Sequence, residues 1–405
     1  MRVLVITRWF PNRFEPVKCI FTKNIVDAQA ISKKYSFVVI SPIPYVPNIN
    51  ISLLQKYVKF RDIPLVEKTQ NYKIYRPKYL KLPYPYLKSL EWYPYFLQVL
   101  KTIKKENIKF GLIHCHGIYP DGLVGIKIGK YFNKKVILHV HESYIETAKE
   151  LNTFKKVFKY VDQIIAVSKF QMGEIVKLDK KLTKKCKIVY NGVKIDKRNT
   201  SFNRQVMGDN ETINLIFVGH LIFRKGLDIL LKALKLLDNQ KYKFSLDVIG
   251  DGEKKLEYKA LSKKYKLEGK VNFIGKVDNV NLLKKMYSYD YFILPTRRES
   301  FGVVLIEAMS CGLPVISTKI EPIPEIVSSE EFGILVEPNN SKALAEGIVR
   351  AINKKWDREL IINYAKKFSI KKTAREIEKV YDEILKGVEN ERTKTLRKTV
   401  EDRGK

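Results

Sequence analysis

Two carboxylates, Glu299 and Glu307, lie eight positions apart in the stretch RRESFGVVLIEAMSCGLP, residues 297–314. Glu307 has apolar neighbours on both sides, so its carboxylate must be hydrogen-bonded, because burial without a partner is costly. The two hydroxyls of a ribose would supply two donors to it. Glu299 is expected to accept a hydrogen bond from a hydroxyl or an amide. The alternative is structural: Glu307 pairs with a lysine, and Glu299 favours the positive end of a helix.

The residues between these carboxylates predict a helix start that binds an anion. The strand-like run YFILPT ends at Thr296, and Ser300 is a suitable N-cap for the helix that follows. Gly302 lets another group approach the backbone closely. The amides of Phe301, Gly302 and Val303 would then meet a ligand at the positive end of the helix dipole. A diphosphate fits this description.

Two cations precede another helix in the stretch FVGHLIFRKGLDILLKAL, residues 217–234. Arg224 and Lys225 come just before Gly226, at a turn that follows an apolar strand-like run. Cations at the mouth of a parallel sheet suit a diphosphate. The alternative is a solvated surface turn, but the apolar strand beside it favours the interpretation that the two cations bind a ligand.

Four of the five histidines form two H-x-H pairs, His114 with His116 and His139 with His141. Residues i and i+2 of a strand share a face, so each pair could chelate a metal. A structural zinc site usually adds cysteines or acids as further ligands, so two H-x-H pairs alone do not favour a metal. We therefore expect His114 and His139 to be packed and neutral and no metal to be bound, with chelation left as the alternative.

Strand-like apolar runs alternate with helical patterns along the chain, which is typical of an α/β protein with parallel sheets. The polar segment 194–212 predicts a linker between two doubly wound domains, at 1–195 and 213–370, and residues 371–405 predict a helix and a charged, frayed tail. Ligands of such sheets bind beyond the carboxyl ends of the strands, so we expect the site in a cleft between the two domains. The predicted strands are 2–7, 36–41, 73–76, 112–116, 135–141, 163–168 and 187–190 in the first domain, and 213–219, 244–250, 271–275, 291–296, 314–318 and 333–338 in the second.

Composition restricts the partners. The chain of 405 residues carries 76 Lys and Arg against 43 Asp and Glu, a formal charge of +33 that attracts anions such as nucleic acid, anionic lipid or phosphorylated molecules. Genome composition or a hot habitat would also raise the lysine content.

The four cysteines are scattered, which argues against a disulfide framework and favours a reduced, cytoplasmic setting. No run reaches the roughly 18–20 apolar residues of a membrane span, and we expect no signal peptide.

The sequence resembles glycosyltransferase family 4, whose members have the two-domain GT-B fold. The block PTRRESFGVVLIEAMSCGLPVIST matches the E-x7-E signature of that family over some twenty positions, and the resemblance covers nearly the whole chain. Other matching stretches are FVGHLIFRKG (217–226), LDVIGDGE (246–253), VNFIGKV (271–277), IVYNGV (188–193) and IPEIV (323–327). The resemblance implies transfer of a sugar from a nucleotide sugar, with retention of anomeric configuration and no metal or other cofactor.

The resemblance also implies roles for the donor-side residues. Lys225, helped by Arg224, would hold the donor phosphates, and Glu307 would bind the ribose diol. The catalytic Glu299 would face the sugar being transferred, and the segment Ser300, Phe301, Gly302 and Val303 would contact sugar and phosphate. The backbone from Ile274 to Lys276 would read the base. Two departures stand out: His220 replaces the arginine of the family, and Glu321 and Pro322 replace a glycine pair.

The acceptor side resembles the family less closely. In HVHES (139–143), His141 corresponds to the histidine of the family near the reacting sugar, but Glu142 and Tyr144 replace its glycine and acid. The stretch HCHGIYPDG, with His116 and Asp121, resembles members that act on bacterial or archaeal surface polymers. The loop before the first helix carries Cys19 where the family has glycine. We expect these residues to bind a glycan or lipid-linked acceptor.

Three alternatives stay open on the sequence. A sugar-nucleotide epimerase shares the fold, and the high charge would suit a nucleic-acid-binding protein, although no nucleic-acid-binding signature is present. The segment 79–105 mixes aromatic residues with lysines, which suits the inner face of a membrane over anionic lipid. A loop and a core helix whose lysines face water would have the same composition.

Overall fold

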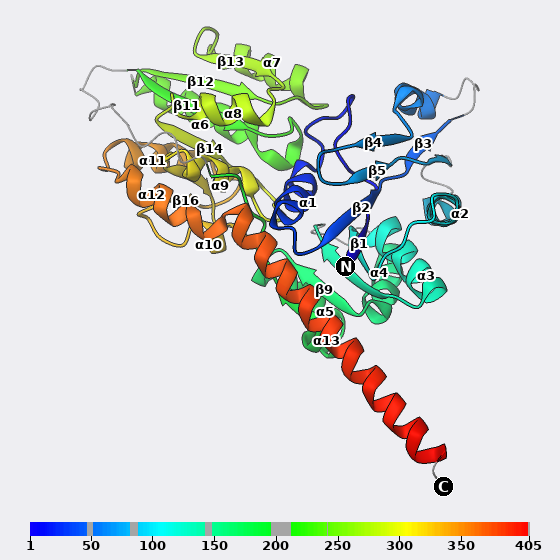
Figure 1. Cartoon of the computed structure of the whole chain (residues 1–405). Coiled ribbons are helices and arrows are strands. Elements are labelled where there is room, and N and C mark those ends of the chain that lie inside the picture. Colours follow the sequence, from blue (N-terminus) through cyan, green and yellow to red (C-terminus); the bar gives the residue numbers. More distant parts are fainter. Residues whose placement is uncertain (47–51, 82–87, 142–147, 196–211, 241, 404–405) are drawn as a thin grey trace. The chain divides into compact units, whose positions relative to one another are not determined.

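The computed structural model describes residues 1–46, 52–81, 88–141, 148–195, 212–240 and 242–403. The chain forms two compact units, one of residues 1–167, 171–190 and 370–405 and the other of residues 168–170 and 191–369 (Figure 1). The sequence placed the boundary at 195 instead of 190. Residues 191–195 belong to the second unit because the amide of Val193 donates to the carbonyl oxygen of Phe368 over 2.9 Å.

The first unit contains a mostly parallel sheet of eight strands. Its strand order is β10-β9-β8-β7-β1-β2-β5-β4, in which only β4 runs antiparallel to its neighbour among the described strands. The order reverses between β1 and β7, and this is where a doubly wound sheet binds its ligand. The strands are β1 (Arg2–Ile6), β2 (Ser36–Ile40), β4 (Val66–Lys68), β5 (Lys73–Tyr75), β7 (Leu112–His116), β8 (Lys135–Val140), β9 (Gln163–Ala166) and β10 (Cys186–Ile188), and a separate pair is formed by β3 (Ile43–Tyr45) and β6 (Lys78–Leu80).

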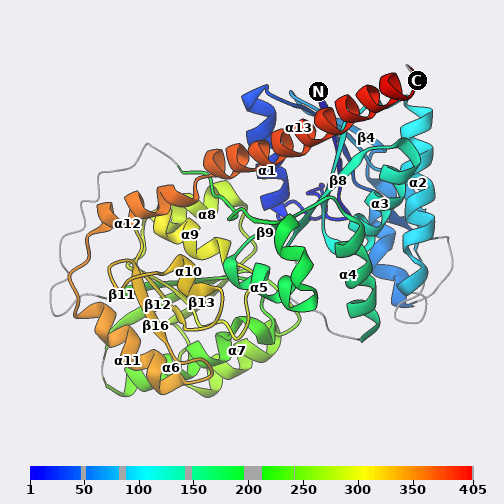
Figure 2. The same cartoon turned by 90° about the horizontal axis from the view of Figure 1, so that it is seen from below.

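Helices cover both faces of this sheet (Figure 2). One face packs against α2 (Trp92–Lys105), α3 (Leu123–Phe132), α4 (Ala148–Tyr160) and α5 (Lys169–Leu178). The other face packs against α1 (Ile20–Ser32) and α13 (Ile370–Arg403), which lie side by side. Buried Ile377 and Tyr381 of α13 fill the core, and Asp382 accepts hydrogen bonds from Lys34 and Tyr35, each over 2.6 Å. The sequence expected a frayed tail, whereas α13 continues to Arg403.

Helix α2 has a buried face and an exposed one. Tyr95, Val99 and Ile103 are buried in the core, as the core-helix alternative expected. The opposite side exposes Tyr93 and Leu97, which stand four positions apart. Lys81, one of the lysines of the segment 79–105, is buried, and its Nζ atom lies 2.7 Å from Glu91. Part of the 79–105 segment, residues 82–87, lies outside the described residues.

The second unit contains a parallel sheet of six strands in the order β13-β12-β11-β14-β15-β16. The order reverses between β11 and β14, which is the position where this architecture binds nucleotides. The strands are β11 (Ile213–Val218), β12 (Phe244–Ile249), β13 (Val271–Gly275), β14 (Tyr291–Leu294), β15 (Val315–Thr318) and β16 (Gly333–Val336). The helices are α6 (Leu227–Asn239), α7 (Lys255–Lys264), α8 (Asn279–Met286), α9 (Val303–Ser310), α10 (Ile323–Ile326), α11 (Ser341–Ile352) and α12 (Arg358–Ala365).

The short helices of the chain complete the description. They are η1 (Ser52–Asp62), η2 (Lys88–Leu90), η3 (Ile118–Gly122), η4 (Lys180–Lys185), η5 (Phe223–Lys225) and η6 (Lys366–Phe368).

Within the part of the chain that the structure describes, no helix combines the length and the apolarity that crossing a membrane would need. Every strand that the sequence predicted is present, with ends that differ by one or two residues at most.

Candidate active site

Two loops of the second unit meet at the reversal point of its sheet. One is the turn between β11 and α6, and the other is the loop between β14 and α9. Gly226 of the turn has a φ of 72°, and a Cβ atom there would lie only 1.9 Å from the carbonyl oxygen of Pro295. The two backbones can approach this closely only because residue 226 has no side chain.

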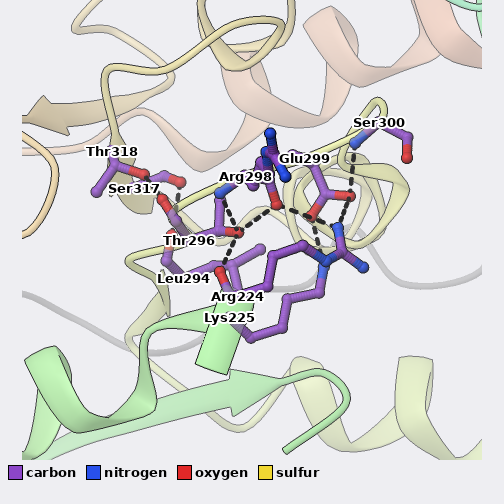
Figure 3. A network of polar contacts seen from close by, with 9 residues as sticks. All are labelled: Arg224, Lys225, Leu294, Thr296, Arg298, Glu299, Ser300, Ser317 and Thr318. Atoms are coloured by element: carbon purple, nitrogen blue, oxygen red, sulfur yellow. Dashed lines mark hydrogen bonds and ion pairs between the residues drawn. The ribbon is translucent and has the colours of Figure 1, made fainter. Parts of the chain in front are cut away.

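Polar contacts fasten the two loops together (Figure 3). The carbonyl oxygen of Arg224 accepts hydrogen bonds from the Thr296 hydroxyl over 3.1 Å and from the Arg297 amide over 2.8 Å. The Arg297 guanidinium donates to both carboxylate oxygens of Asp228 over 2.8 and 2.7 Å. This fork-shaped pairing fixes orientation as well as distance, so the side chains on the two loops have defined positions.

Glu299 lies between the two cations that the sequence singled out. Its carboxylate is buried, with the Lys225 Nζ atom at 2.5 Å and the Arg224 Nη1 atom at 3.6 Å. It also accepts a hydrogen bond from the Ser300 amide over 3.0 Å, which agrees with the expected amide donor. Burial alone would raise the pKa of Glu299, but the charges of Lys225 and Arg224 outweigh burial and lower it. The carboxylate is therefore ionised and paired.

The start of helix α9 differs from the sequence prediction. The helix begins at Val303, and its N-cap is Gly302, which has a φ of 99°, so the expectation that Ser300 caps the helix is wrong. A Cβ atom at position 302 would lie 3.1 to 3.3 Å from the methyl groups of Leu305, Ile323 and Ile326. Glycine meets both demands, the left-handed backbone and the lack of space.

Glu307 is held by an amide and not by a lysine. The Asn279 side chain donates to Glu307 Oε1 over 2.8 Å, which joins the first residue of α8 to the middle of α9. Burial raises the pKa of Glu307, and the hydrogen bond from Asn279 partly offsets this rise. A neutral donor, the Asn279 amide, thus stands where the structural alternative expected a lysine. The other carboxylate oxygen of Glu307 can accept a hydrogen bond from a hydroxyl.

The remaining donor-side residues border the same end of the sheet. His220 follows β11, and Ile274 and Lys276 lie at the end of β13, where both side chains are exposed. Burial and the nearby charges of Lys225, Lys276 and Arg224 lower the pKa of His220. Its imidazole is therefore neutral at pH 7, and it cannot replace the charge of an arginine.

The acceptor-side residues lie at the carboxyl ends of β1, β7 and β8 in the first unit. The ring nitrogens His116 Nδ1 and His141 Nε2 are 3.0 Å apart. Burial lowers the pKa of both histidines, and that of His116 falls to about 3. Cys19 precedes α1 with a φ of 50°, which is the left-handed conformation that favours the glycine of the family. Asp121 is buried and accepts a hydrogen bond from the Tyr95 hydroxyl over 2.7 Å.

Sequence reasoning missed several residues that organise this site. Asn279 lies in an ordinary helix start, and nothing in the sequence indicates that it contacts a glutamate 28 positions away. Arg297 and Asp228 are likewise 69 positions apart. Only the fold brings such pairs together, although the position of Arg297 inside the E-x7-E block was a signal that could have been followed.

Comparison with known proteins gives these sites a context. Residues 199–368 match the family described as glycosyl transferases group 1, and residues 61–197 match the one described as glycosyltransferase family 4. An uncharacterized glycosyltransferase of Methanocaldococcus jannaschii is 30% identical over 313 residues, which are 74% of this chain and 84% of the relative. The chain belongs to the family 4 glycosyltransferases.

Two further comparisons place this glycosyltransferase more widely. A putative teichuronic acid biosynthesis glycosyltransferase of Bacillus subtilis is 25% identical over 368 residues, 86% of this chain and 89% of the relative. The Anabaena protein HepE, solved in complex with UDP-glucose, has a TM-score of 0.68 at 19% identity, over 95% of this chain and all of that one. This likeness shows the fold, a GT-B arrangement of two Rossmann-like domains. Membership of the family does not favour an epimerase or a nucleic-acid-binding protein.

Substituting Gly226 tests the backbone contact between the two loops. In the glycosyltransferase, Gly226→Ala should lower the unfolding free energy by about 3 kcal/mol or more, because the new methyl group meets the Pro295 carbonyl. Gly269→Ala is the matched control, since Gly269 has a similar φ of 77° and nothing within 4 Å of its would-be Cβ. The control should cost only about 1 kcal/mol of backbone strain. Equal losses in urea unfolding would show that the contact is unimportant.

A double-mutant cycle tests the buried ion pair. Lys225→Met should lower the unfolding free energy by about 3 kcal/mol, because Glu299 loses its nearest counter-charge inside the protein. Adding Glu299→Gln to that variant should restore most of the loss, since no charge is then left unpaired. Lys232→Met, an exposed change on α6, should have almost no effect. Strictly additive effects of the two substitutions would argue against the pairing.

Proposed function

We propose that this glycosyltransferase moves a sugar from a nucleotide sugar held by its second unit to a glycan or lipid-linked acceptor held by its first unit. The observation that carries the proposal is the convergence of Arg224 and Lys225 with the start of helix α9 at the reversal point of the second sheet. Cations and helix amides at this position are suited to a diphosphate. The Anabaena neighbour, whose fold is similar, was solved with UDP-glucose.

The phosphates take the place beside Arg224 and Lys225. Both cations already contact Glu299, so the local charge is one carboxylate against two cations. A diphosphate supplies the negative charge that this group lacks. The amides of Gly302 and Val303 extend the same anion site, because the first amides of a helix have no acceptor within the helix. Phe301, which is buried, and Ser300 hold the preceding backbone in place.

The nucleoside extends from the phosphates toward α8 and β13. Glu307 accepts from the ribose hydroxyls, with Asn279 holding its other oxygen. The backbone from Ile274 to Lys276 lies at the carboxyl end of β13 and reads the base. His220 lies beside the phosphates as a neutral group and contributes hydrogen bonding instead of charge.

The transfer step proceeds with retention on one face of the sugar. The bond from the anomeric carbon to the phosphate oxygen breaks, and a bond from the acceptor oxygen forms on the same face. The acceptor proton passes to the leaving phosphate oxygen, so the protein supplies no general base. Glu299 and His141 are assigned to the reacting sugar, where they position it, and the cations stabilise the leaving charge. The step requires no metal, so adding Mg²⁺ or Mn²⁺ should not accelerate it.

The acceptor is assigned to the carboxyl ends of β1, β7 and β8, with Cys19 and His116 nearest to it. Asp121 is assigned to the same side, where it is buried and its Oδ1 atom accepts a hydrogen bond from the Tyr95 hydroxyl. A polymeric or lipid-linked glycan of the cell surface is the acceptor class we infer, and the Bacillus relative named for teichuronic acid biosynthesis supports it. Donor sugar and acceptor are best identified with a panel of sugar nucleotides.

A ribose-deletion experiment tests the donor site. The wild-type chain should bind UDP or GDP at least about tenfold more tightly than the matching 2′-deoxy nucleotide, because hydrogen bonds to a charged group are worth about 1.5–3 kcal/mol. Glu307→Ala should bind the two forms equally. Isothermal titration calorimetry measures both affinities and their ratio.

The control for this experiment is Glu268→Ala, which removes an exposed carboxylate elsewhere in the second unit. It should keep the wild-type preference for the ribonucleotide. If Glu307→Ala keeps that preference too, the ribose assignment is wrong. If the wild-type chain binds no nucleoside diphosphate at all, the proposed donor class is wrong.

We also propose that the outer side of α2 contacts an anionic membrane on the cytoplasmic side. Exposed Tyr93 and Leu97 of α2 are four positions apart, and Lys101 and Lys104 continue the same stripe. Exposed Leu90 lies just before this helix, at the end of η2. Apolar and aromatic side chains next to lysines suit the boundary between headgroups and acyl chains. A lipid-linked acceptor would then be reached at that surface.

Vesicle binding tests this membrane contact. The wild-type chain should sediment with vesicles that contain phosphatidylglycerol, and added salt should weaken the binding. Tyr93→Ser with Leu97→Ser should reduce partitioning roughly tenfold, because apolar area leaves the contact. Leu256→Ser with Val280→Ser, which removes exposed apolar residues of the second unit, should leave it unchanged. Equal effects of the two double variants would contradict the role of α2.

A further inference from the structure

Four histidines gather on one face of the first sheet. His114 and His116 end β7, and His139 and His141 stand on the neighbouring β8 and just beyond it. The strands are parallel, and His116 pairs in register with His139. Ring centroids of His114 and His116 are 4.2 Å apart, and those of His114 and His139 are 5.5 Å apart with nearly parallel planes. The sequence predicted two H-x-H pairs at the ends of adjacent parallel strands, and the observed register joins them into one cluster.

The outer ring nitrogens of this cluster already have partners. His114 Nδ1 lies 2.6 Å from the hydroxyl oxygen of Tyr381 on α13. His116 Nδ1 lies 3.0 Å from His141 Nε2. Such contacts fix the tautomer and the orientation of a ring, as the partners of metal-binding histidines commonly do. These contacts use the Nδ1 atoms of His114 and His116, so the Nε2 atoms of both rings take no part in them.

The inner nitrogens lack protein partners. Among the described residues, no hydrogen-bond partner reaches Nε2 of His114, Nε2 of His116 or either ring nitrogen of His139. All three side chains are buried, with exposed fractions of 0%, 5% and 0%. Buried nitrogens without partners cost free energy, and each of these three histidines has at least one such nitrogen, which packing alone does not explain.

We propose that His114, His116 and His139 bind one divalent transition-metal ion, for which Zn²⁺ is the best match. One ring nitrogen from each histidine lies within 4.8 Å of the others. Tetrahedral zinc with Zn–N distances of about 2.0–2.1 Å needs nitrogens roughly 3.4 Å apart, so small side-chain rotations suffice. Imidazole nitrogens select zinc, copper, iron or nickel over magnesium and calcium.

The ion would tie three parts of the first unit together. It joins β7 to β8 directly, and it reaches α13 through the contact between His114 and Tyr381. Three protein ligands leave one position for water or another small group. A buried water molecule bridging the same nitrogens is the competing explanation. The transfer step itself stays without a metal. The proposal adds a second role, that of a metal ligand, to His116, which we assign above to the acceptor side and which contacts His141.

Metal content of the full-length chain tests the proposal. The protein should carry no polyhistidine tag and should be prepared both from zinc-supplemented cells and by refolding with Zn²⁺. Elemental analysis of both preparations should find about one ion per chain after gel filtration. The proposal is wrong if both hold less than about 0.1 ion of any transition metal per chain, which is the result that a bridging water predicts.

Variants locate the site. His139→Gln should lose the ion, whereas His220→Gln, which removes the one histidine outside the cluster, should keep it. A folded His139→Gln chain with the full metal content would overturn the assignment. If that variant does not fold, the visible absorption spectrum of the wild-type chain refolded with Co²⁺ gives the answer. Intense bands indicate four or five ligands and support the site, whereas the weak bands of octahedral Co²⁺ contradict it.

Tyr381→Phe separates orientation from ligation. It keeps the ring in the core and removes only the hydroxyl that contacts His114 Nδ1. Zinc affinity measured by competition with a chelator should fall about 10- to 100-fold, as is typical when a partner of a ligating histidine is removed. An unchanged affinity would mean that the ion does not use His114.

Discussion

The candidate site in the second unit of this glycosyltransferase depends on the approach of two backbone segments. Gly226 and Pro295 touch where any side chain at position 226 would lie 1.9 Å from a carbonyl oxygen. This contact brings the turn after β11 against the loop after β14, at the point where the strand order of the sheet reverses. Because both loops are held, Arg224 and Lys225 face a defined position beside the start of α9.

The charged side chains at this contact between the two loops determine which kind of ligand suits it. Glu299 is buried, and it is stable there because Lys225 and Arg224 lie within 4 Å. The cost of burying an ion is offset only when its partners are well placed. The positive excess that remains favours an anionic ligand, while Glu307 and Asn279 provide a neighbouring polar site for hydroxyl groups. One arrangement thus explains why both glutamates occur in an apolar segment.

Sequence patterns predicted most of the fold because its central strands are continuous apolar runs. The three-residue strands β3, β4 and β6 escaped prediction because they lie at the edge of the main sheet or outside it, where backbone pairing and not an apolar run defines the strand. The motif singled out Lys225, Glu299 and Glu307 as candidate site residues, and the structure brings Lys225 and Glu299 into contact. The cap at Gly302 and the pairing of Glu307 with Asn279 were not, because both depend on packing between helices. The histidine cluster depends on strand register, which two H-x-H motifs do not specify.

Crystals of the glycosyltransferase grown with UDP or GDP test the central claim most directly. The account predicts electron density for the diphosphate against Arg224 and Lys225, with phosphate oxygens near the amides of Gly302 and Val303. It also predicts that the ribose hydroxyls lie within hydrogen-bond distance of Glu307. A nucleotide bound elsewhere in the second unit, with Lys225 and Glu299 paired as before and no phosphate beside them, would contradict it.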